Sequence, residues 1–498
     1  MADSSRVSSE SRPVSPPTAV AAAVLAALLL AAILFPAVRP GGLLRDFNAF
    51  YCAGRVLAAG ADPYRAEPLG ACERIARPAP FLVGDPGLVM PAPLPPYALW
   101  PFGALAQLPY LAAALVWTTL GVLAVGVAVF AMRRLTGLPL LPLVAAFALG
   151  DGYASLCLGQ VAPLAVAAIA VSALLLARNR DEWAACAAGV AMLEPHVGLP
   201  LCASLFVWRS RTRLPLIAIT ALCVGASLAA VGLSTALEYV RDVLPAHAAS
   251  EIANEKQFSL TYALHRLAVP DGLALRAGEA WYLAAVGAGI WAAGRLAQRY
   301  CNAAVIAVVP PALAVFGGPF VHVIQIAAAL PAALLLYPYA APRAQRALGW
   351  ALVALAIPWV QFANLGTIFV ALAALVAALL ARAFVDARPT TVAAAAIGAV
   401  AFLATAIAAV HAIPDASAVL LAHYDPKALA ETSWTLYVRT IGTANAAAFD
   451  FAKVPTIAAL ATLAFVALAA SFRATEMRPP FLASGGKGAA APRRIALH

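Results

Sequence analysis

The stretch PYLAAALVWTTLGVLAVGVAVFAM, residues 109–132, decides the fold of this chain. It carries no charged side chain, and it is long enough for one helix to cross the hydrocarbon core of a bilayer. Arg133 and Arg134 follow at once. Basic residues at the end of an apolar span mark the cytoplasmic side of a membrane. The stretch therefore predicts a helix that crosses the membrane inward.

The rest of the chain has the same character. Of its 498 residues, 63% are hydrophobic and 11% are charged. A soluble protein of this size could not bury that much apolar surface, so the composition indicates a polytopic membrane protein. The net charge of +10 does not indicate nucleic-acid binding, because predicted cytoplasmic segments hold 20 of the 33 Lys and Arg. This asymmetry is the expected topology signal of a membrane protein.

Apolar length and the Lys/Arg pattern together predict an all-α bundle of about 12 transmembrane helices. One transmembrane domain is expected over 18–472, between disordered cytoplasmic tails at 1–17 and 473–498. Three long segments should lie outside and carry short interfacial helices: 39–107, 234–280 and 412–452. The predicted spans are about 18–38, 109–132, 138–151, 161–177, 214–233, 281–297, 303–317, 321–338, a hairpin at 347–381, 390–411 and 455–471.

Residues 184–207 do not fit a single crossing. Basic residues flank the segment on both sides, and Pro195 and Pro200 interrupt it. We therefore predict a re-entrant pair of short helices that meet near Glu194-Pro195-His196, with both ends in the cytoplasm. Irregular backbone at membrane depth is tolerated where protein or a water-filled cavity surrounds it.

The candidate for catalysis lies just after the first span, in Leu44-Arg45-Asp46-Phe47-Asn48-Ala49-Phe50-Tyr51. Asp46 should sit at the outer membrane boundary, where it could act as a general base on a hydroxyl that arrives from water. Arg45 should help to keep its carboxylate ionised. Phe47 and Tyr51 share a face if the segment is helical. The alternative is an interfacial acid with an aromatic belt that anchors the helix end.

Two acidic residues fall inside apolar spans, where an ionisable group is a functional candidate. Asp151, near Gly159-Gln160, either lines the active cavity or belongs to an Asp-Gly turn. Glu194 either has a functional role or forms an internal Glu–His or Glu–Arg pair that stabilises the break at Pro195; we favour the internal pair.

Further polar residues lie near predicted outer helix ends. His322 follows Gly317-Gly318-Pro319-Phe320 at a helix start and either binds a phosphate or is a satisfied polar residue. Lys256, Gln257, Ser259 and His265 bring cations and amides together in the second external segment, unless they only form a solvated loop face. The seven cysteines are scattered without a CxxC pair, so they imply neither a metal site nor a disulfide framework. No cofactor is expected.

Several motifs, in order, resemble glycosyltransferase family 87, the polyprenol-phosphate-mannose-dependent mannosyltransferases with a GT-C fold. The resemblance runs from about 40 to 340. It rests on Arg45-Asp46-Phe47, Phe50-Tyr51, Asp62-Pro63-Tyr64, Pro93-Leu94-Pro95-Pro96 leading to Leu99-Trp100-Pro101-Phe102, Gly159-Gln160, Ala188-Gly189 to Pro195, Gln257-Phe258-Ser259-Leu260 and His322. The resemblance implies a lipid-phosphate sugar donor, an acidic base after the first span, and inversion. Glu194 departs from it, because many members have Lys-Pro where this chain has Glu-Pro.

These features predict an inverting glycosyltransferase of the bacterial plasma membrane, with both termini cytoplasmic and the active site outside. It would move a sugar, mannose by the resemblance, from a polyprenyl phosphate to a lipid or glycan hydroxyl. Asp46 would be the base. His322, Arg45, Lys256 and Gln257 would bind the donor phosphate. Lining residues would be Tyr51, Asp151, Gln160, Ser259 and His265. The alternatives are a transporter or lipid-linked sugar flippase, and a scaffold without catalysis.

Overall fold

The computed structural model describes residues 44–473 except 77–86, 366–367, 413 and 443; it leaves undescribed the side chains of Asp151, Leu365, Ile368 and Arg473. The described residues form helices and loops, with one isolated antiparallel bridge between Arg65 and Leu429 and no strand. The all-α prediction is confirmed. The predicted span at 18–38 and the tails at 1–17 and 474–498 lie outside the described residues.

Short helices fill the first predicted external segment. They are α2 (Arg45–Ala58), α3 (Ala66–Ala76) and α4 (Pro96–Leu105). A disulfide between Cys52 and Cys72 joins α2 to α3. The sequence-based view that the cysteines imply no disulfide is therefore wrong. Cys52 and Cys72 are 20 residues apart, and only the turn of the chain after α2 brings their Cα atoms to 5.6 Å.

The deciding stretch forms α5 (Tyr110–Thr136), which ends with Arg133 and Arg134 in its last turn and Gly137 at a φ of 67°. Glycine adopts this left-handed conformation without a steric penalty, which ends the helix. The next span, predicted over 138–151, extends to Leu158 in the structure. Helix α6 (Leu140–Phe147) continues through a π-helical segment, η2 (Ala148–Tyr153), into α7 (Ala154–Leu158). Asp151-Gly152 thus lies within a widened helical turn and not in a reverse turn.

The break predicted near Glu194 is present. Helix α8 (Ala162–Ala177) leads to α9 (Asp181–Ala191), and α10 (Pro195–Trp208) begins with a proline at its first position. A Cβ at Gly198 would lie 2.4 Å from the carbonyl oxygen of Ala191, so glycine permits the close return of α10. The re-entrant course of this pair stays a prediction.

The second predicted external segment is mostly helical. After η3 (Ser210–Thr212), α11 (Arg213–Glu238) continues through η4 (Tyr239–Val243) and α12 (Leu244–Glu251). Then follow α13 (Leu260–Arg266) and α14 (Asp271–Tyr300). Helix α14 begins ten residues before the predicted start at 281, because Asp271, directly after Pro270, opens its first turn. Acidic residues stabilise that end of a helix.

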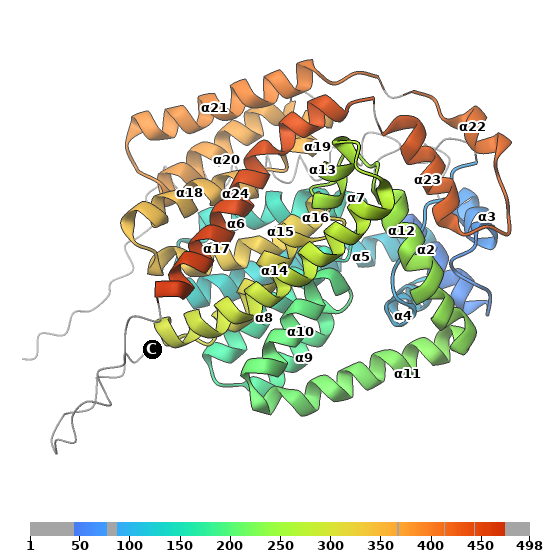
Figure 1. Ribbon diagram of the computed structural model, residues 1–498, viewed down its shortest axis with the longest axis horizontal. Coiled ribbons are helices and arrows are strands. Elements are labelled where there is room, and N and C mark those ends of the chain that lie inside the picture. The colour runs from blue at the N-terminus through green and yellow to red at the C-terminus, as the bar shows by residue number, and fades with distance from the viewer. Residues whose placement is uncertain (1–43, 77–86, 366–367, 413, 443, 474–498) are drawn as a thin grey trace, which may run out of the picture.

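The C-terminal part completes the bundle with α15 (Val305–Gly317), α16 (Val323–Ile326), η5 (Ala327–Ala329), α17 (Leu330–Leu336), η6 (Tyr337–Tyr339), α18 (Pro342–Ala356), α19 (Trp359–Leu365), α20 (Ile368–Phe384), α21 (Pro389–Ala408), α22 (Ser417–Ala422), α23 (Ala430–Ile441) and α24 (Ala446–Arg473). In Figure 1, α22 and α23 lie beside α2 and α3 at one end of the molecule. That end collects parts of the first and third predicted external segments.

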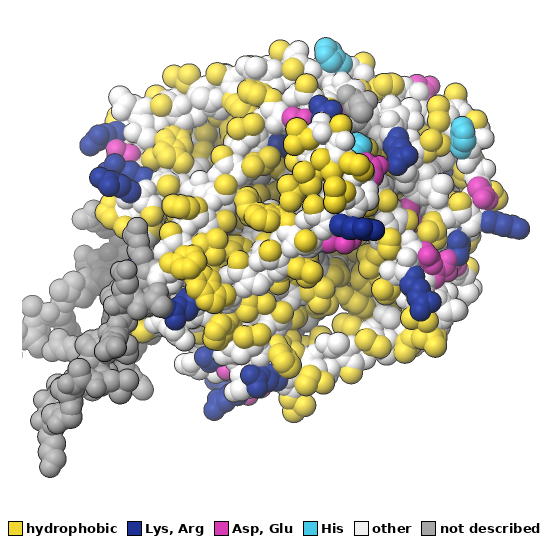
Figure 2. Space-filling model, viewed as in Figure 1, with side chains coloured by type: hydrophobic (Ala, Val, Ile, Leu, Met, Phe, Trp, Pro, Cys, Tyr) yellow, Lys and Arg dark blue, Asp and Glu magenta, His cyan; other side chains and the backbone are white. Residues whose placement is uncertain are grey.

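The surface fits a membrane protein. Within the described residues, five helices are long and apolar enough to cross a membrane: Tyr110–Thr136, Leu140–Leu158, the run Ser210–Glu251, Pro389–Ala408 and Ala446–Phe472. Large apolar side chains point outward, such as Leu115 on α5 and Leu222 on α11, each about 70% exposed. Figure 2 shows hydrophobic side chains across one face, with Lys and Arg mainly around its margins. The number of crossings, about 12, stays a prediction.

Candidate functional site

Asp46 lies in the first turn of α2, directly against the end of α7. Leu44, at a φ of 58°, precedes the helix, and its backbone N–H donates to the carbonyl oxygen of Cys157. Gly159 then closes α7 at a φ of 75°, and a Cβ there would lie 2.4 Å from the Cβ of Phe47. The Gly159-Gln160 pair is thus explained: glycine lets α2 approach, and the amide of Gln160 then donates to Oδ2 of Asp46.

The aromatic residues after Asp46 form a core. Phe47 is fully buried and stacks on Trp117 of α5 at a centroid distance of 6.1 Å. The Tyr51 hydroxyl donates to the carbonyl oxygen of Leu108. These rings do not form an outward aromatic belt; they hold α2 rigidly against α4 and α5. Tyr51, predicted to line the cavity, therefore lies in this aromatic core.

His322 lies beside a buried carboxylate from a distant part of the chain. Its Nε2 is 3.2 Å from Oε2 of Glu251, at the end of α12, and 2.8 Å from the amide nitrogen of Gln257. The same amide nitrogen donates to Glu251 at 2.8 Å, and Oε1 of Gln257 accepts from the backbone N–H of Val321 at 2.6 Å. Gln257 thus fastens the loop after α12 to the start of α16.

A further amide continues this polar cluster toward the helix break. Gln325 accepts from the backbone N–H of His322 and donates to Oε1 of Glu194 at 3.1 Å. The partner of Glu194 is therefore a neutral amide, and not the His or Arg pair expected within the break. His322 also exerts a charge interaction on both Glu194 and Asp46.

Two cations stand over aromatic rings near Asp46. The Arg45 guanidinium lies 5.7 Å from the Trp434 ring centroid and 5.4 Å from that of Tyr437, both on α23. The Lys256 ammonium lies 5.7 Å from the ring of Phe449. Such cation–π contacts orient a cation without neutralising it. Arg45 and Lys256 thus lie against aromatic rings in the neighbourhood of the Asp46 carboxylate.

Burial raises the pKa of Asp46 above its ordinary value. The hydrogen bond from Gln160 and the charges of Arg45 and His322 oppose this rise, while Glu251 adds to it. Arg45 therefore acts in the expected direction, but desolvation outweighs it. Burial likewise lowers the pKa of Lys256. The site is a partly dehydrated cluster of opposite charges, which is typical of functional sites.

Two of the remaining predicted residues, Ser259 and His265, have partners outside this cluster. Ser259 caps α13, its hydroxyl oxygen accepting from the backbone N–H of Tyr262. Nδ1 of His265 pairs with Asp271 at 2.9 Å on the exposed start of α14. Asp151 lies in η2, which packs against α16, but its side chain is not described. Within the described residues, no group of His, Cys, Asp and Glu has the arrangement of a metal site.

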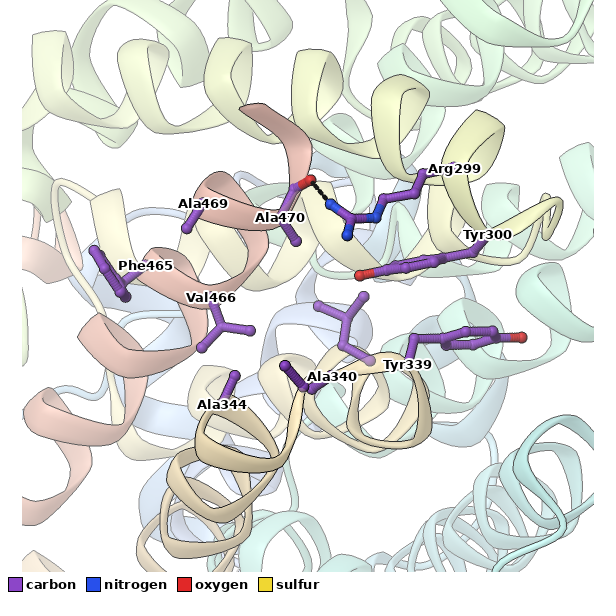
Figure 3. Close-up of a pocket in the computed structure, with 11 residues that line it drawn as sticks. Arg299, Tyr300, Tyr339, Ala340, Ala344, Phe465, Val466, Ala469 and Ala470 are labelled. Carbon is purple, nitrogen blue, oxygen red and sulfur yellow. Dashed lines mark hydrogen bonds between the residues drawn. The ribbon is translucent and has the colours of Figure 1, made fainter. Parts of the chain in front are cut away.

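Two cavities differ in what surrounds them. One, about 120 Å³, lies where α14, α17, α18 and α24 meet, lined by Arg299, Tyr300, Tyr339 and apolar residues that include Phe465 (Figure 3). None of the predicted site residues lines it. The other, about 370 Å³, is an apolar groove between α4, α10 and α11, and Tyr97, Met192 and Tyr239 line it. Met192 directly precedes the break that carries Glu194, so the groove adjoins the polar cluster.

The model of glycosyltransferase family 87 matches residues 94–316. The match covers less than half of the chain. The resemblance stated from the motifs is confirmed, and the protein is a membrane glycosyltransferase. The matched region contains Gln160, Glu194, Glu251 and Gln257, whereas Asp46 and His322 lie on either side of it.

Among solved structures, the glycosyltransferase has a weak likeness to the crystal structure of ArnT from Cupriavidus metallidurans bound to undecaprenyl phosphate. The two are 16% identical over 90% of this chain and 77% of that chain, with a TM-score of 0.30. Comparison with curated proteins gave no match. The GT-C arrangement of the helices stays a prediction.

Sequence reasoning missed three members of the glycosyltransferase's polar cluster: Glu251, Gln325 and Trp434. Glu251 is 2% exposed and contacts His322, and Trp434 donates to its Oε1 at 2.6 Å. Glu251 stands five residues before the cation–amide pair Lys256-Gln257, which was the available signal. Trp434, 183 residues further on, offered none, because only the packing of α23 on α12 brings it near.

Proposed function

We propose that this glycosyltransferase moves a sugar, mannose by family resemblance, from a polyprenyl-phosphate donor to a hydroxyl of a lipid or glycan acceptor. The transfer takes place on the outer face of the membrane and inverts the anomeric carbon. The observation that carries this proposal is the convergence of Asp46 and His322. These residues lie 276 positions apart in the chain, yet they belong to one polar cluster with Arg45, Lys256 and Gln257.

Asp46 serves as the general base. Its carboxylate takes the proton from the acceptor hydroxyl as the acceptor oxygen bonds to the anomeric carbon. The bond from that carbon to the donor phosphate oxygen breaks on the opposite side, and its electron pair leaves with the phosphate. Phosphate is a good leaving group, so a second carboxyl as general acid is dispensable, in contrast to a glycosidase. A raised pKa makes Asp46 a better proton acceptor than an ordinary aspartate.

Cations and amides around Asp46 suit a departing phosphate. His322, Arg45 and Lys256 can supply positive charge, and Gln257 joins the Glu251 carboxylate beside the histidine ring to the backbone of Val321. Preorganised charge of this kind stabilises the transition state where negative charge develops. The apolar groove lined by Tyr97, Met192 and Tyr239 has the lining that a prenyl tail requires, and the Glu194–Gln325 hydrogen bond connects its border with His322.

The test is transfer from a radiolabelled polyprenyl-phosphate mannose to endogenous acceptors in membranes that contain the protein. We expect Asp46→Asn to lower transfer by about 10²–10⁴-fold, the usual contribution of a general base. Expression should not change, because asparagine has the same shape.

Asp62→Asn is the matched control. Asp62 lies in the same predicted external segment but pairs with Arg65 at 3.1 Å, and this variant should keep near wild-type transfer. Near wild-type transfer by Asp46→Asn, with loss in Asp151→Asn, would move the base to η2. Movement of a lipid-linked sugar across the bilayer without any transfer would favour the flippase instead.

A further inference from the structure

Glu251 is a buried carboxylate with several hydrogen-bond donors around it, and it belongs to the polar cluster. Oε2 accepts from the amides of Asn254 and Gln257 at 2.7 and 2.8 Å, and Oε1 accepts from Nε1 of Trp434 at 2.6 Å. Its remaining close partner is Nε2 of His322, at 3.2 Å. Among the described residues, this ring is its only ion-pair partner. A buried carboxylate is costly unless it is paired, so its charge must act on His322.

Trp434 extends the influence of Glu251 to a second cation. The indole that donates to Glu251 also lies under the Arg45 guanidinium. The Glu251 carboxylate therefore contacts the His322 ring directly. Through its hydrogen bond it also orients the Trp434 indole, on which the Arg45 guanidinium lies. Arg45 of α2 and His322, which precedes α16, are also two basic residues that interact with the Asp46 carboxylate.

The charges that face His322 come from several elements. Negative groups are Asp46 of α2, Glu194 before α10 and Glu251 of α12. The other titratable groups nearby are two buried histidines, His196 of α10 and His247 of α12. The elements packed against α16 also carry Tyr153 of η2 and Cys157 of α7. Arg45 and Lys256 lie on the Asp46 side. Carboxylates thus predominate around the ring.

The contacts of the His322 ring depend on which of its nitrogens carry a proton. A neutral ring with its proton on Nδ1 would accept from Gln257 at Nε2 and leave no proton for Glu251. A doubly protonated ring would donate from Nε2 to Glu251 and carry a positive charge. A neutral ring with its proton on Nε2 would also donate to Glu251, so the negative charge of that buried carboxylate, and not the contact alone, favours the doubly protonated ring. When Nε2 carries a proton, the Gln257 amide donates to Glu251 and not to the ring.

We propose that Glu251 is a positioning residue that holds His322 as an oriented cation for an anionic phosphate, and that it sets the Trp434 platform of Arg45 at the same time. The phosphate is that of the lipid-linked donor, so this inference rests on the proposed function. Glu251 acts through His322 and Arg45 and does not touch the reacting atoms.

The experiment compares Glu251→Gln, His322→Gln and the double variant in the transfer assay between pH 6 and pH 8.5. Glutamine can still accept from Trp434, but it carries no charge. At pH 8 the donor KM of Glu251→Gln should rise by about tenfold or more, as expected when one charged contact is lost, with a smaller change in kcat. At pH 6 the KM should approach the wild-type value, since acid protonates His322 without help.

The double variant should match His322→Gln alone, because Glu251 acts on donor binding mainly through that ring. Glu73→Gln is the control: Glu73 is also buried, but it accepts from the backbone N–H of Met90 in the α3 region, and its KM profile should follow the wild type. An equal rise in KM at every pH, or additive effects in the double variant, would overturn the proposal.

A binding measurement separates this inference from the proposed reaction. Undecaprenyl phosphate in nanodiscs should raise the melting temperature of the wild type, and the ratio of variant to wild-type affinity should fall as pH rises for Glu251→Gln. If this holds while no sugar is transferred, the reaction is wrong and the role of Glu251 stands. If transfer occurs and the affinity ratio is flat with pH, the role of Glu251 is wrong.

Trp434→Phe, which removes only the indole donor, covers the case in which Glu251→Gln does not fold: its donor KM should rise at all pH values, and an unchanged KM would contradict the Arg45 arm.

Discussion

The pKa of Asp46 depends on how far the surrounding residues exclude water from its carboxylate. Asp46 follows Arg45, and the sequence alone suggests a carboxylate that stays readily ionised. In the structure, Arg45 lies over two rings of α23, and burial of Asp46 raises its pKa in spite of Gln160 and the nearby cations. The Asp46 carboxylate therefore binds a proton more readily than an ordinary aspartate does.

The raised pKa predicts an acid limb in the pH profile. A base works only when deprotonated, so kcat/KM should fall as pH decreases through the Asp46 pKa, at a higher pH than for an ordinary aspartate. Gln160→Leu removes a hydrogen bond that favours the charged form, so it should move this limb to still higher pH. Pre-steady-state transfer rates across pH would measure the limb. Gln107→Leu, at an exposed glutamine in the same predicted segment, should leave it in place.

Glu431 offers a stability test at the same scale. It is 1% exposed, and neither side-chain oxygen has a hydrogen-bond partner among the described residues. Burial, assisted by the charge of Asp62, raises its pKa to about 8. In the unfolded chain the pKa is about 4.3. Protonated Glu431 therefore contributes its full stabilisation of the folded protein below the unfolded-chain pKa of about 4.3. This stabilisation is lost as the pH rises toward 8, the pKa in the folded protein.

Glu431→Gln should remove this pH dependence. Its melting temperature at pH 8 should exceed that of the wild type by a few degrees, with little difference at pH 5. Thermal unfolding in detergent at both values would measure it. The exposed Glu182→Gln serves as the reference, and an unchanged wild-type melting temperature between pH 5 and pH 8 would argue against a buried, protonated Glu431.

At the scale of elements, the disulfide decides how firmly α2 is placed. Cys52–Cys72 ties α2, which carries Asp46, to α3 across a separation of 20 residues. A cross-link over a loop of this length contributes about 3 kcal/mol by restricting the unfolded chain. Disulfides persist on the oxidising side of a membrane, which agrees with an outer location for residues 39–107.

Cys52→Ala/Cys72→Ala should therefore lower the melting temperature and, because α2 is less firmly held, reduce transfer. Thiol labelling of the denatured wild type, before and after reduction, should reveal two additional thiols after reduction. Cys186→Ala, at an exposed free cysteine, is the control. Full labelling of all seven cysteines without reduction would show that the bond does not form in the membrane.

At the scale of the whole molecule, the fold gathers parts of all three predicted external segments around the site. Arg45 and Asp46 come from the first, Glu251, Lys256 and Gln257 from the second, and Trp434 from the third. A shared site requires these segments to lie on the same side of the membrane. The positive-inside pattern assigns that side to the exterior.

Cysteine labelling of intact cells would test this arrangement. In a background without Cys186 and Cys301, membrane-impermeant reagent should label new cysteines at three exposed positions in the external segments, and an exposed inner position should be protected. The outer positions are Ala59, Leu267 and Lys427, and the inner one is Glu182. Protection of any outer position, together with labelling of Glu182, would reverse the topology.

The sequence by itself determined the membrane class, the helical architecture and the break near Glu194, because these follow from local apolar length, charge and proline. It also singled out residues that the fold brings together: Arg45, Asp46, Gln160, Lys256, Gln257 and His322. Only the tertiary structure decided which residues contact one another. Glu251 meets His322, Trp434 meets Arg45 and Cys52 meets Cys72 because distant helices pack together, and burial then outweighs the charge beside Asp46. Desolvation depends on all the surrounding atoms, so no local pattern could have predicted it.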